Sequence, residues 1–143
     1  MLFGEARHNM DAKNRLFIPA NQRDELGETF MAVPSFRDKC INLYSMEEWK
    51  KYYDNIKSKL ADNGRRLAEI NRFLHHSAAQ LTPDAQGRVV LTAKLVAHAG
   101  IAKNVVIIGC GDYAEIWSEE NYQATMDEFD MASMVASLEE CGL

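Results

Sequence analysis

Two short segments of this chain carry an aspartate and an arginine at the same spacing. Asp11-Ala-Lys-Asn-Arg15 returns later in the chain as Asp84-Ala-Gln-Gly-Arg88. An aspartate at such a position can cap a tight turn and orient the arginine. An arginine at a hairpin tip can pair bidentately with O6 and N7 of guanine, and a nearby lysine can contact phosphate. The spacing therefore suggests DNA chemistry, although an Asp–Arg pair that only locks its own turn has the same spacing.

The candidate DNA-contacting residues are the basic and polar side chains in and around these turns. The first choices are Arg15, Lys13 and Arg88, followed by Asn14 and Gln86 at the tips and by the weaker candidates Arg7 and Arg23. Three further residues are expected to shape the loops: Asp11, Asp84 and Gly87. Glycine readily takes a positive φ and asparagine is the next most tolerant type, so Gly87 and Asn14 suit equivalent turn positions.

The two motifs belong to a longer internal repeat. The separation of Asp84 from Asp11 gives an offset of 73 residues. Without a gap, the same offset aligns turn glycines, apolar positions and a helix start, with these pairs: Ala20 and Ala93, Gly27 and Gly100, Val33 and Val106, Leu43-Tyr44-Ser45 and Ile116-Trp117-Ser118. Such a match over many positions predicts a duplicated fold unit.

Each repeat predicts the same order of elements. An extended segment, the Asp-x-x-x-Arg turn and a second strand come first, followed by a short helix that ends at Gly27 or Gly100. A second hairpin follows, with strands expected at 29–34 and 41–44 and at 105–108 and 114–117. Ser45 then opens a helix with a capping box to Glu48.

The chain divides into four regions on this pattern: a first unit at 5–48, a helical connector at 49–76, a second unit at 77–120 and an acidic helical tail at 121–143. The connector has helical apolar spacing and is expected to break at Asp62-Asn63-Gly64. Each half is too small to bury its apolar faces alone. Strands of both units should therefore combine into one α+β body.

Charge is spread unevenly along the chain. The net charge is −5, yet residues 1–104 hold all 16 Lys and Arg against 12 acids, and residues 105–143 hold nine acids and no Lys or Arg. A basic body with an acidic end can bind DNA through one face. No signal peptide or bilayer-spanning apolar run is recognised, so an intracellular protein without a membrane partner is expected.

No constellation typical of an enzyme or a metal site stands out. Cys40, Cys110 and Cys141 form no CxxC pair, and His75 and His76 would point about 100° apart on a helix. Residues 109–114 imitate a dinucleotide-binding G-x-G-x-x-A, but the repeat makes them a hairpin turn. The expectation is a non-enzyme with no cofactor, no metal and no small-molecule substrate.

The chain resembles the MraZ family of bacterial transcription regulators, whose halves belong to the SpoVT/AbrB swapped-hairpin group. The resemblance runs from Met1 to about Leu138, and these segments carry it: 11–20, 44–49, 84–88, 98–100, 105–109 and 115–117. It implies two tandem swapped-hairpin units that form one pseudo-twofold β-barrel, and ring-like homo-oligomers. It also implies a nucleoid-associated cytoplasmic protein that binds short tandem repeats in double-stranded promoter DNA. The implied target is its own promoter and the division and cell-wall gene cluster, with repression as the expected outcome.

Two departures from the family pattern affect the loops. Asn14 replaces the usual glycine of the first loop, and in the second copy Thr92 and Val96 replace the usual proline and arginine. The first copy keeps both as Pro19 and Arg23, so the resemblance implies that the first loop is the better equipped for DNA. Two alternatives remain open: an antitoxin of the same hairpin group, and an oligomeric interaction scaffold based on the Met-rich acidic tail.

Overall fold

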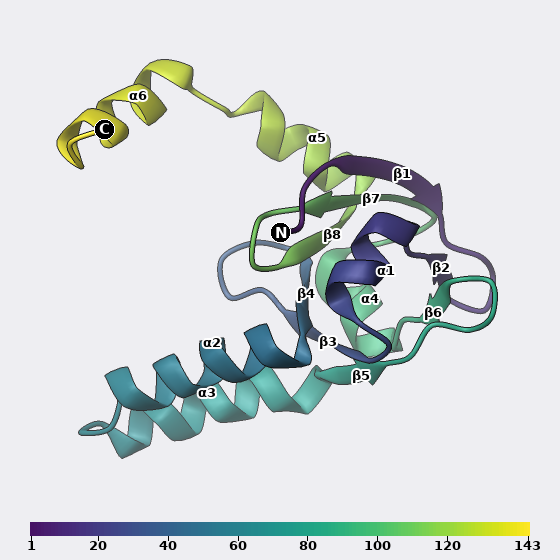
Figure 1. Cartoon of the computed structure of the whole chain (residues 1–143), viewed down its shortest axis with the longest axis horizontal. Helices are drawn as coiled ribbons and strands as arrows, with labels where there is room; N and C mark the ends of the chain where they lie inside the picture. Colours follow the sequence, from purple (N-terminus) through teal and green to yellow (C-terminus); the bar gives the residue numbers. More distant parts are fainter.

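Eight strands and six helices make up the computed structural model, which describes all residues 1–143 of the chain (Figure 1). The first unit contains β1 (Glu5–Asn9), β2 (Arg15–Phe17), α1 (Ala20–Leu26), β3 (Phe30–Pro34) and β4 (Ile41–Ser45). Two helices follow, α2 (Met46–Lys59) and α3 (Gly64–Ser77). The second half contains β5 (Ala79–Leu81), β6 (Arg88–Val90), α4 (Ala93–Ala99), β7 (Asn104–Gly109), β8 (Ala114–Ser118), α5 (Glu119–Asp127) and α6 (Met131–Glu140).

The strands form two antiparallel sheets, which confirms the mixed α+β class. The larger sheet has the order β1-β7-β8-β4-β3-β5, and β2 pairs with β6 in a separate two-stranded sheet. The expected closed barrel is therefore not formed by the hydrogen bonds, because β1 and β5 remain edges of an open sheet. Both β2 and β6 have only three residues before the chain turns toward a helix, which leaves few backbone groups to join those edges.

The pairings are symmetric between the two halves. Leu16 lies opposite Val89 in the small sheet, and Asn42 lies opposite Glu115 where β4 meets β8. In each pair the second residue is the repeat equivalent of the first, at the offset of 73 that separates Asp84 from Asp11. A pseudo-twofold axis therefore passes through both pairs, and strands of the two units share one large sheet.

The ungapped alignment is wrong across β3 and β7. Phe30 pairs with Ser45, and Val105 pairs with Ser118, so the equivalent of Val33 is Ile108 and not Val106. Between the helix glycine and the residue paired with the capping serine, the second unit has two more residues, 101–104 against 28–29. In the turn that follows, the first unit has two more, 35–40 against 110–113. The two length changes cancel, which restores the common offset at Ser45 and Ser118. Residues 109–114 form the β7–β8 turn, as predicted.

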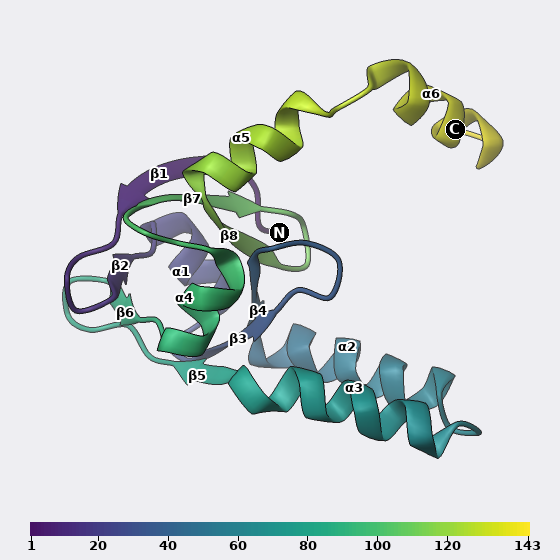
Figure 2. The ribbon, with the colours of Figure 1, turned by 180° about the vertical axis from the view of Figure 1, so that it is seen from behind.

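Helices α1 and α4 pack beside the inner strands, where Leu26, Leu95 and Ala99 join the main buried cluster (Figure 2). Helix starts follow local capping: the hydroxyls of Ser45, Thr92 and Ser118 each accept a backbone N–H three residues later. Such caps satisfy donors that the first helical turn leaves free. The serine caps are thus confirmed in both units. The predicted capping box is not completed, because the Glu48 carboxylate accepts from Lys51 Nζ at 3.2 Å and not from the backbone N–H of Ser45.

The connector and the tail form two separate projections. The predicted break at residues 62–64 is confirmed, and α2 and α3 form an antiparallel arm in which Tyr53 Oη lies 2.6 Å from Asn71 Oδ1. Helix α5 is anchored by buried Tyr122, whose ring contacts Trp117, whereas α6 has no buried residue. Both projections extend from the same side of the body (Figure 1). None of the helices has the length and apolar character needed to cross a membrane.

Candidate nucleic-acid interface

The first Asp-x-x-x-Arg loop is organised by the Asp11 carboxylate. Asp11 Oδ1 accepts the backbone N–H groups of Lys13 and Arg15, both at 2.9 Å, and Oδ2 accepts Arg15 Nε at 2.6 Å. The Arg15 backbone hydrogen bond is the main cause that holds the Asp11 pKa below its ordinary value. The carboxylate therefore stays ionised, caps the turn and fixes the arginine.

The second loop repeats this arrangement. Asp84 Oδ1 accepts the backbone N–H groups of Gln86 and Arg88, both at 2.9 Å, and Oδ2 accepts Arg88 Nε at 3.0 Å. The Arg88 backbone hydrogen bond is again the main cause that lowers the Asp84 pKa. In both loops the aspartate engages Nε, while the terminal Nη atoms of Arg15 and Arg88 make no hydrogen bond within the chain. Each arginine is thus oriented at one edge and free to contact a ligand at the other.

The turn conformation explains the residues at the two tips. Asn14 has φ 58° and Gly87 has φ 79°, which confirms that both occupy the left-handed region. A glycine takes this conformation freely, and asparagine tolerates it better than most residues. The change from glycine to asparagine in the first loop therefore keeps the same turn.

The two loops are joined side by side. Across the β2–β6 pair, Ile18 N–H donates to Gly87 O and Leu91 N–H donates to Asn14 O, each at 2.9 Å. The carbonyl before each loop arginine is therefore bonded to the other unit. The loops lie at one end of the molecule, away from the α2–α3 arm and α6 (Figures 1 and 2). Lys13, Asn14, Arg15, Gln86 and Arg88 are thereby brought into one surface.

Arg23 was expected to support DNA binding by the first loop, but its side chain lies beside the second loop. Its Nε donates to Ile18 O at 2.8 Å, and its guanidinium lies 5.5 Å from the centre of the Phe17 ring. A Cβ built on Gly87 would lie only 2.8 Å from Arg23 Cζ, so this guanidinium covers the tip of the second loop. No local sequence pattern predicts this contact, because it depends on how α1 packs against the other unit.

Arg7 is placed differently from the loop residues. It lies on β1, where Nη1 donates to Glu119 and Nη2 donates to Glu5, both at 3.0 Å. Two carboxylates thus already surround this guanidinium. Arg7 remains the weakest of the candidate DNA contacts.

The cysteine and histidine side chains singled out in the sequence are held by contacts within the fold. Cys40 is buried, and burial followed by the nearby Glu115 carboxylate raises the pKa of its thiol. His75 and His76 each place Nδ1 next to a backbone carbonyl of their own helix, at 2.9 and 2.6 Å. A protonated thiol is a poor nucleophile, so Cys40 is explained by packing.

Similarity of the sequence to known proteins identifies the family of this chain. The family described as "MraZ protein, putative antitoxin-like" matches residues 1–70 and again residues 74–141, one match for each half. A Heliobacterium modesticaldum protein named "Transcriptional regulator MraZ" is 40% identical over 122 residues, covering 85% of this chain and 84% of that protein. Proteins of the same name from Lactobacillus helveticus and Clostridium tetani are 41% and 34% identical, covering 90% and 100% of this chain and 88% and 100% of theirs. The chain therefore belongs to the MraZ family.

Proposed function

We propose that this chain is a transcriptional regulator that binds double-stranded promoter DNA through its paired Asp-x-x-x-Arg loops. The carrying observation is that Arg15 and Arg88 are each fixed at Nε by an aspartate while their Nη atoms have no partner in the chain. The names of the relatives support regulation of transcription. Arginine presented in this way matches the bidentate acceptors of guanine.

The loops have complementary tasks in this proposal. Arg15 and Arg88 read base edges in the major groove, and the exposed Lys13 contacts phosphate. Asn14 and Gln86 add polar contacts at the tips. Because the turns are already ordered by hydrogen bonds, less conformational entropy is lost when they bind.

Assembly would increase the affinity of such a surface. We propose ring-like homo-oligomers in which several loop pairs engage short tandem repeats, so that each bound site raises the local concentration of the next. The proposed target is the protein's own promoter and the adjoining division and cell-wall genes, with repression as the outcome. The acidic tail lies at the end opposite the loops (Figure 1), which keeps its negative charge away from DNA.

Single substitutions test the loop assignment. In fluorescence anisotropy with duplex DNA from upstream of the gene, Arg15→Ala and Arg88→Ala should each weaken specific binding by about 1–3 kcal/mol, or roughly 5- to 150-fold. Arg65→Ala is the matched control, because Arg65 is exposed on α3 in the distant arm. Unchanged affinity in both loop variants would reject the proposal.

Lys13→Ala separates phosphate contact from base reading. Loss of one phosphate contact should reduce the slope of log affinity against log salt by about 0.9 and weaken specific and non-specific duplexes alike. Arg15→Ala should instead reduce the difference between them. Identical behaviour of the two variants would contradict the separate roles.

A further inference from the structure

The outward face of the small β2–β6 sheet carries the two loop arginines together with two apolar side chains. The middle residue of each strand is buried in the main core. Because side chains alternate along a strand, the residues on either side of it point outward. The register places Arg15 opposite Val90 and Phe17 opposite Arg88. Each arginine therefore has an apolar neighbour directly across the sheet.

The apolar neighbour of Arg88 is covered by residues of its own unit. The Arg23 guanidinium lies 5.5 Å from the centre of the Phe17 ring, and the centre of the His8 ring lies 5.2 Å away. Both contacts stabilise the aromatic ring in its place. Phe17 is therefore only partly exposed, and its contacts are made within the chain.

The apolar neighbour of Arg15 has no such cover. Val90 is the repeat equivalent of the phenylalanine, and the residues that correspond to the covering arginine and histidine are Val96 and Leu81. Val96 packs against the main core, and Leu81 is buried within it. Val90 itself is 58% exposed. The difference between the two units thus leaves one exposed apolar side chain beside a loop arginine.

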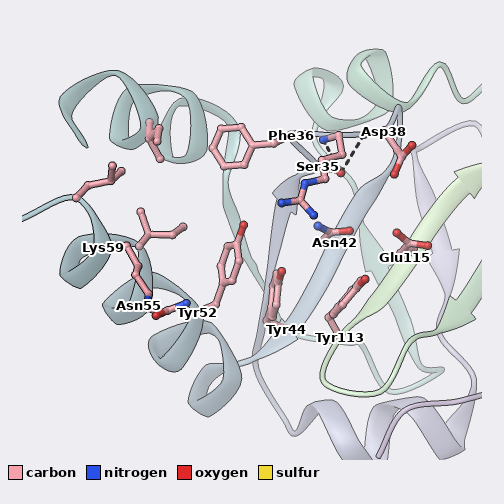
Figure 3. Close-up of a pocket in the computed structure, with 14 residues that line it drawn as sticks. Ser35, Phe36, Asp38, Asn42, Tyr44, Tyr52, Asn55, Lys59, Tyr113 and Glu115 are labelled. Carbon is pink, nitrogen blue, oxygen red and sulfur yellow. Dashed lines mark hydrogen bonds between the residues drawn. The ribbon is translucent and has the colours of Figure 1, made fainter. Parts of the chain in front are cut away.

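Val90 differs from the exposed phenylalanine in the β3–β4 turn. Phe36 is 45% exposed, but its ring lies 4.5 Å from that of Phe73, and it lines a pocket of about 500 Å³ (Figure 3). Charges of both signs line that pocket: Arg37, Lys59, Asp38 and Glu115. The pocket therefore selects no ligand by its charge, whereas Val90 lies on a face where both charged side chains are arginines.

DNA offers an apolar group that matches Val90. In the major groove the thymine C5-methyl is the apolar group, and the other distinguishing groups are hydrogen-bond donors and acceptors. Asp11 Oδ2 accepts Arg15 Nε at 2.6 Å, which holds the guanidinium near its own loop and shortens its reach. Cβ atoms across an antiparallel pair lie about 5 Å apart, and base pairs rise by about 3.4 Å. The arginine and the valine can therefore contact neighbouring base pairs together.

We propose that Val90 contacts the C5-methyl group of a thymine next to the guanine that Arg15 reads. This inference rests on the DNA binding proposed above and adds one base to what the first loop recognises, through a residue of the second unit. Arg88 has no corresponding apolar group free for DNA, because Arg23 covers Phe17. The two halves of the paired surface thus prefer different sequences.

Removal of single thymine methyl groups tests the contact. Each thymine of the promoter duplex is replaced in turn by deoxyuridine, which lacks only the C5-methyl, and binding of the full chain is measured by fluorescence anisotropy. The wild-type chain should lose about fourfold in affinity at the contacted position, the loss expected for one buried methyl group. Val90→Ala should bind the thymine and deoxyuridine duplexes equally at that position.

Two controls show that the effect belongs to this contact. Val135→Ala is the matched variant, because Val135 is an apolar residue 43% exposed on α6, and it should keep the methyl dependence. Val90→Ala should keep the wild-type circular dichroism spectrum and the wild-type mass in sedimentation velocity, since Val90 is exposed. A changed mass would assign Val90 to a contact between copies and overturn the proposal.

The other contrary results concern DNA alone. A wild-type chain that binds every deoxyuridine duplex as tightly as the thymine duplex, or a Val90→Ala chain that keeps the methyl dependence, would overturn the proposed contact. Weaker binding by Arg15→Ala would still support the loop assignment in both cases. A wild-type chain that binds no promoter duplex would overturn both proposals, so the two failures are distinguishable.

Discussion

The two Asp-x-x-x-Arg loops share a backbone but differ in what covers their tips. In the second loop, Gly87 leaves space for the Arg23 guanidinium of the first unit. In the first loop, Asn14 holds the tip, and the repeat equivalent of Arg23 is the shorter Val96, which packs against the main core. The two halves therefore differ at both of these positions: Arg23 lies beside Gly87, whereas their repeat equivalents are Val96 and Asn14.

The first loop has a smaller advantage in basic residues than the sequence indicates. By sequence, Lys13, Arg15 and Arg23 all belong to the first unit. In the structure, Arg23 lies beside Gly87, so each loop has two cations: Lys13 and Arg15 at the first, and Arg88 and Arg23 at the second. The two loops are thus more evenly equipped than the chain order indicates.

The largest expected effect is at the contact that joins the loops. Leu16 is fully buried and lies opposite Val89, so Leu16→Ala should lower the free energy of unfolding by about 2–5 kcal/mol. Urea denaturation measures this loss, and exposed Val90→Ala, in the same small sheet, is the control with a change within about 0.5 kcal/mol. A small effect of Leu16→Ala would show that the loops are not coupled through this pair.

Exchange of the tip residues should produce the next largest effect. Gly87→Asn keeps a residue that tolerates positive φ but places a side chain against Arg23, at a cost of about 1–3 kcal/mol in unfolding free energy. Arg23→Val in the same chain should restore part of that loss. A double-mutant cycle from thermal or urea unfolding should give a coupling of at least about 0.5 kcal/mol. Additive single effects would contradict coupling between the two positions.

Removal of Arg23 alone should have a smaller effect on DNA binding. Arg23→Ala removes the cation over Phe17 and beside Gly87, and affinity should fall by about 1 kcal/mol, or roughly fivefold. Arg7→Ala is the matched control, because two carboxylates already hold Arg7. Equal losses in the two variants would indicate a general charge effect rather than a contribution from the second loop.

The smallest effect should appear in acid. The pKa values of Asp11 and Asp84 are lowered in the folded chain, so their ionised forms stabilise it above the unfolded pKa. This stabilisation is lost as pH falls through the folded pKa. Asp11→Asn and Asp84→Asn should therefore flatten the decline of stability below about pH 4, measured by circular dichroism. Asp62→Asn, at an exposed position in the arm, should leave the acid profile unchanged.

Short-range chemistry made much of the fold predictable. The loop hydrogen bonds run over at most four residues, the positive φ values follow from Asn14 and Gly87, and the serine caps act within one helical turn. The same local rules located the connector break and both hairpins. They could not reveal the length changes around β3 and β7. The longer loop before β7 is offset by the shorter turn after it, so the repeat keeps the same offset on both sides of these strands.

The sequence by itself determined the duplicated units, the two capped turns and the arginines that they present, since each depends on neighbours in the chain. Only the tertiary structure decided that the large sheet stays open, that Arg23 covers the loop of the other unit, and that α6 is left without a partner. The physical reason is that these features depend on contacts between residues far apart in the chain, whose packing no local spacing specifies.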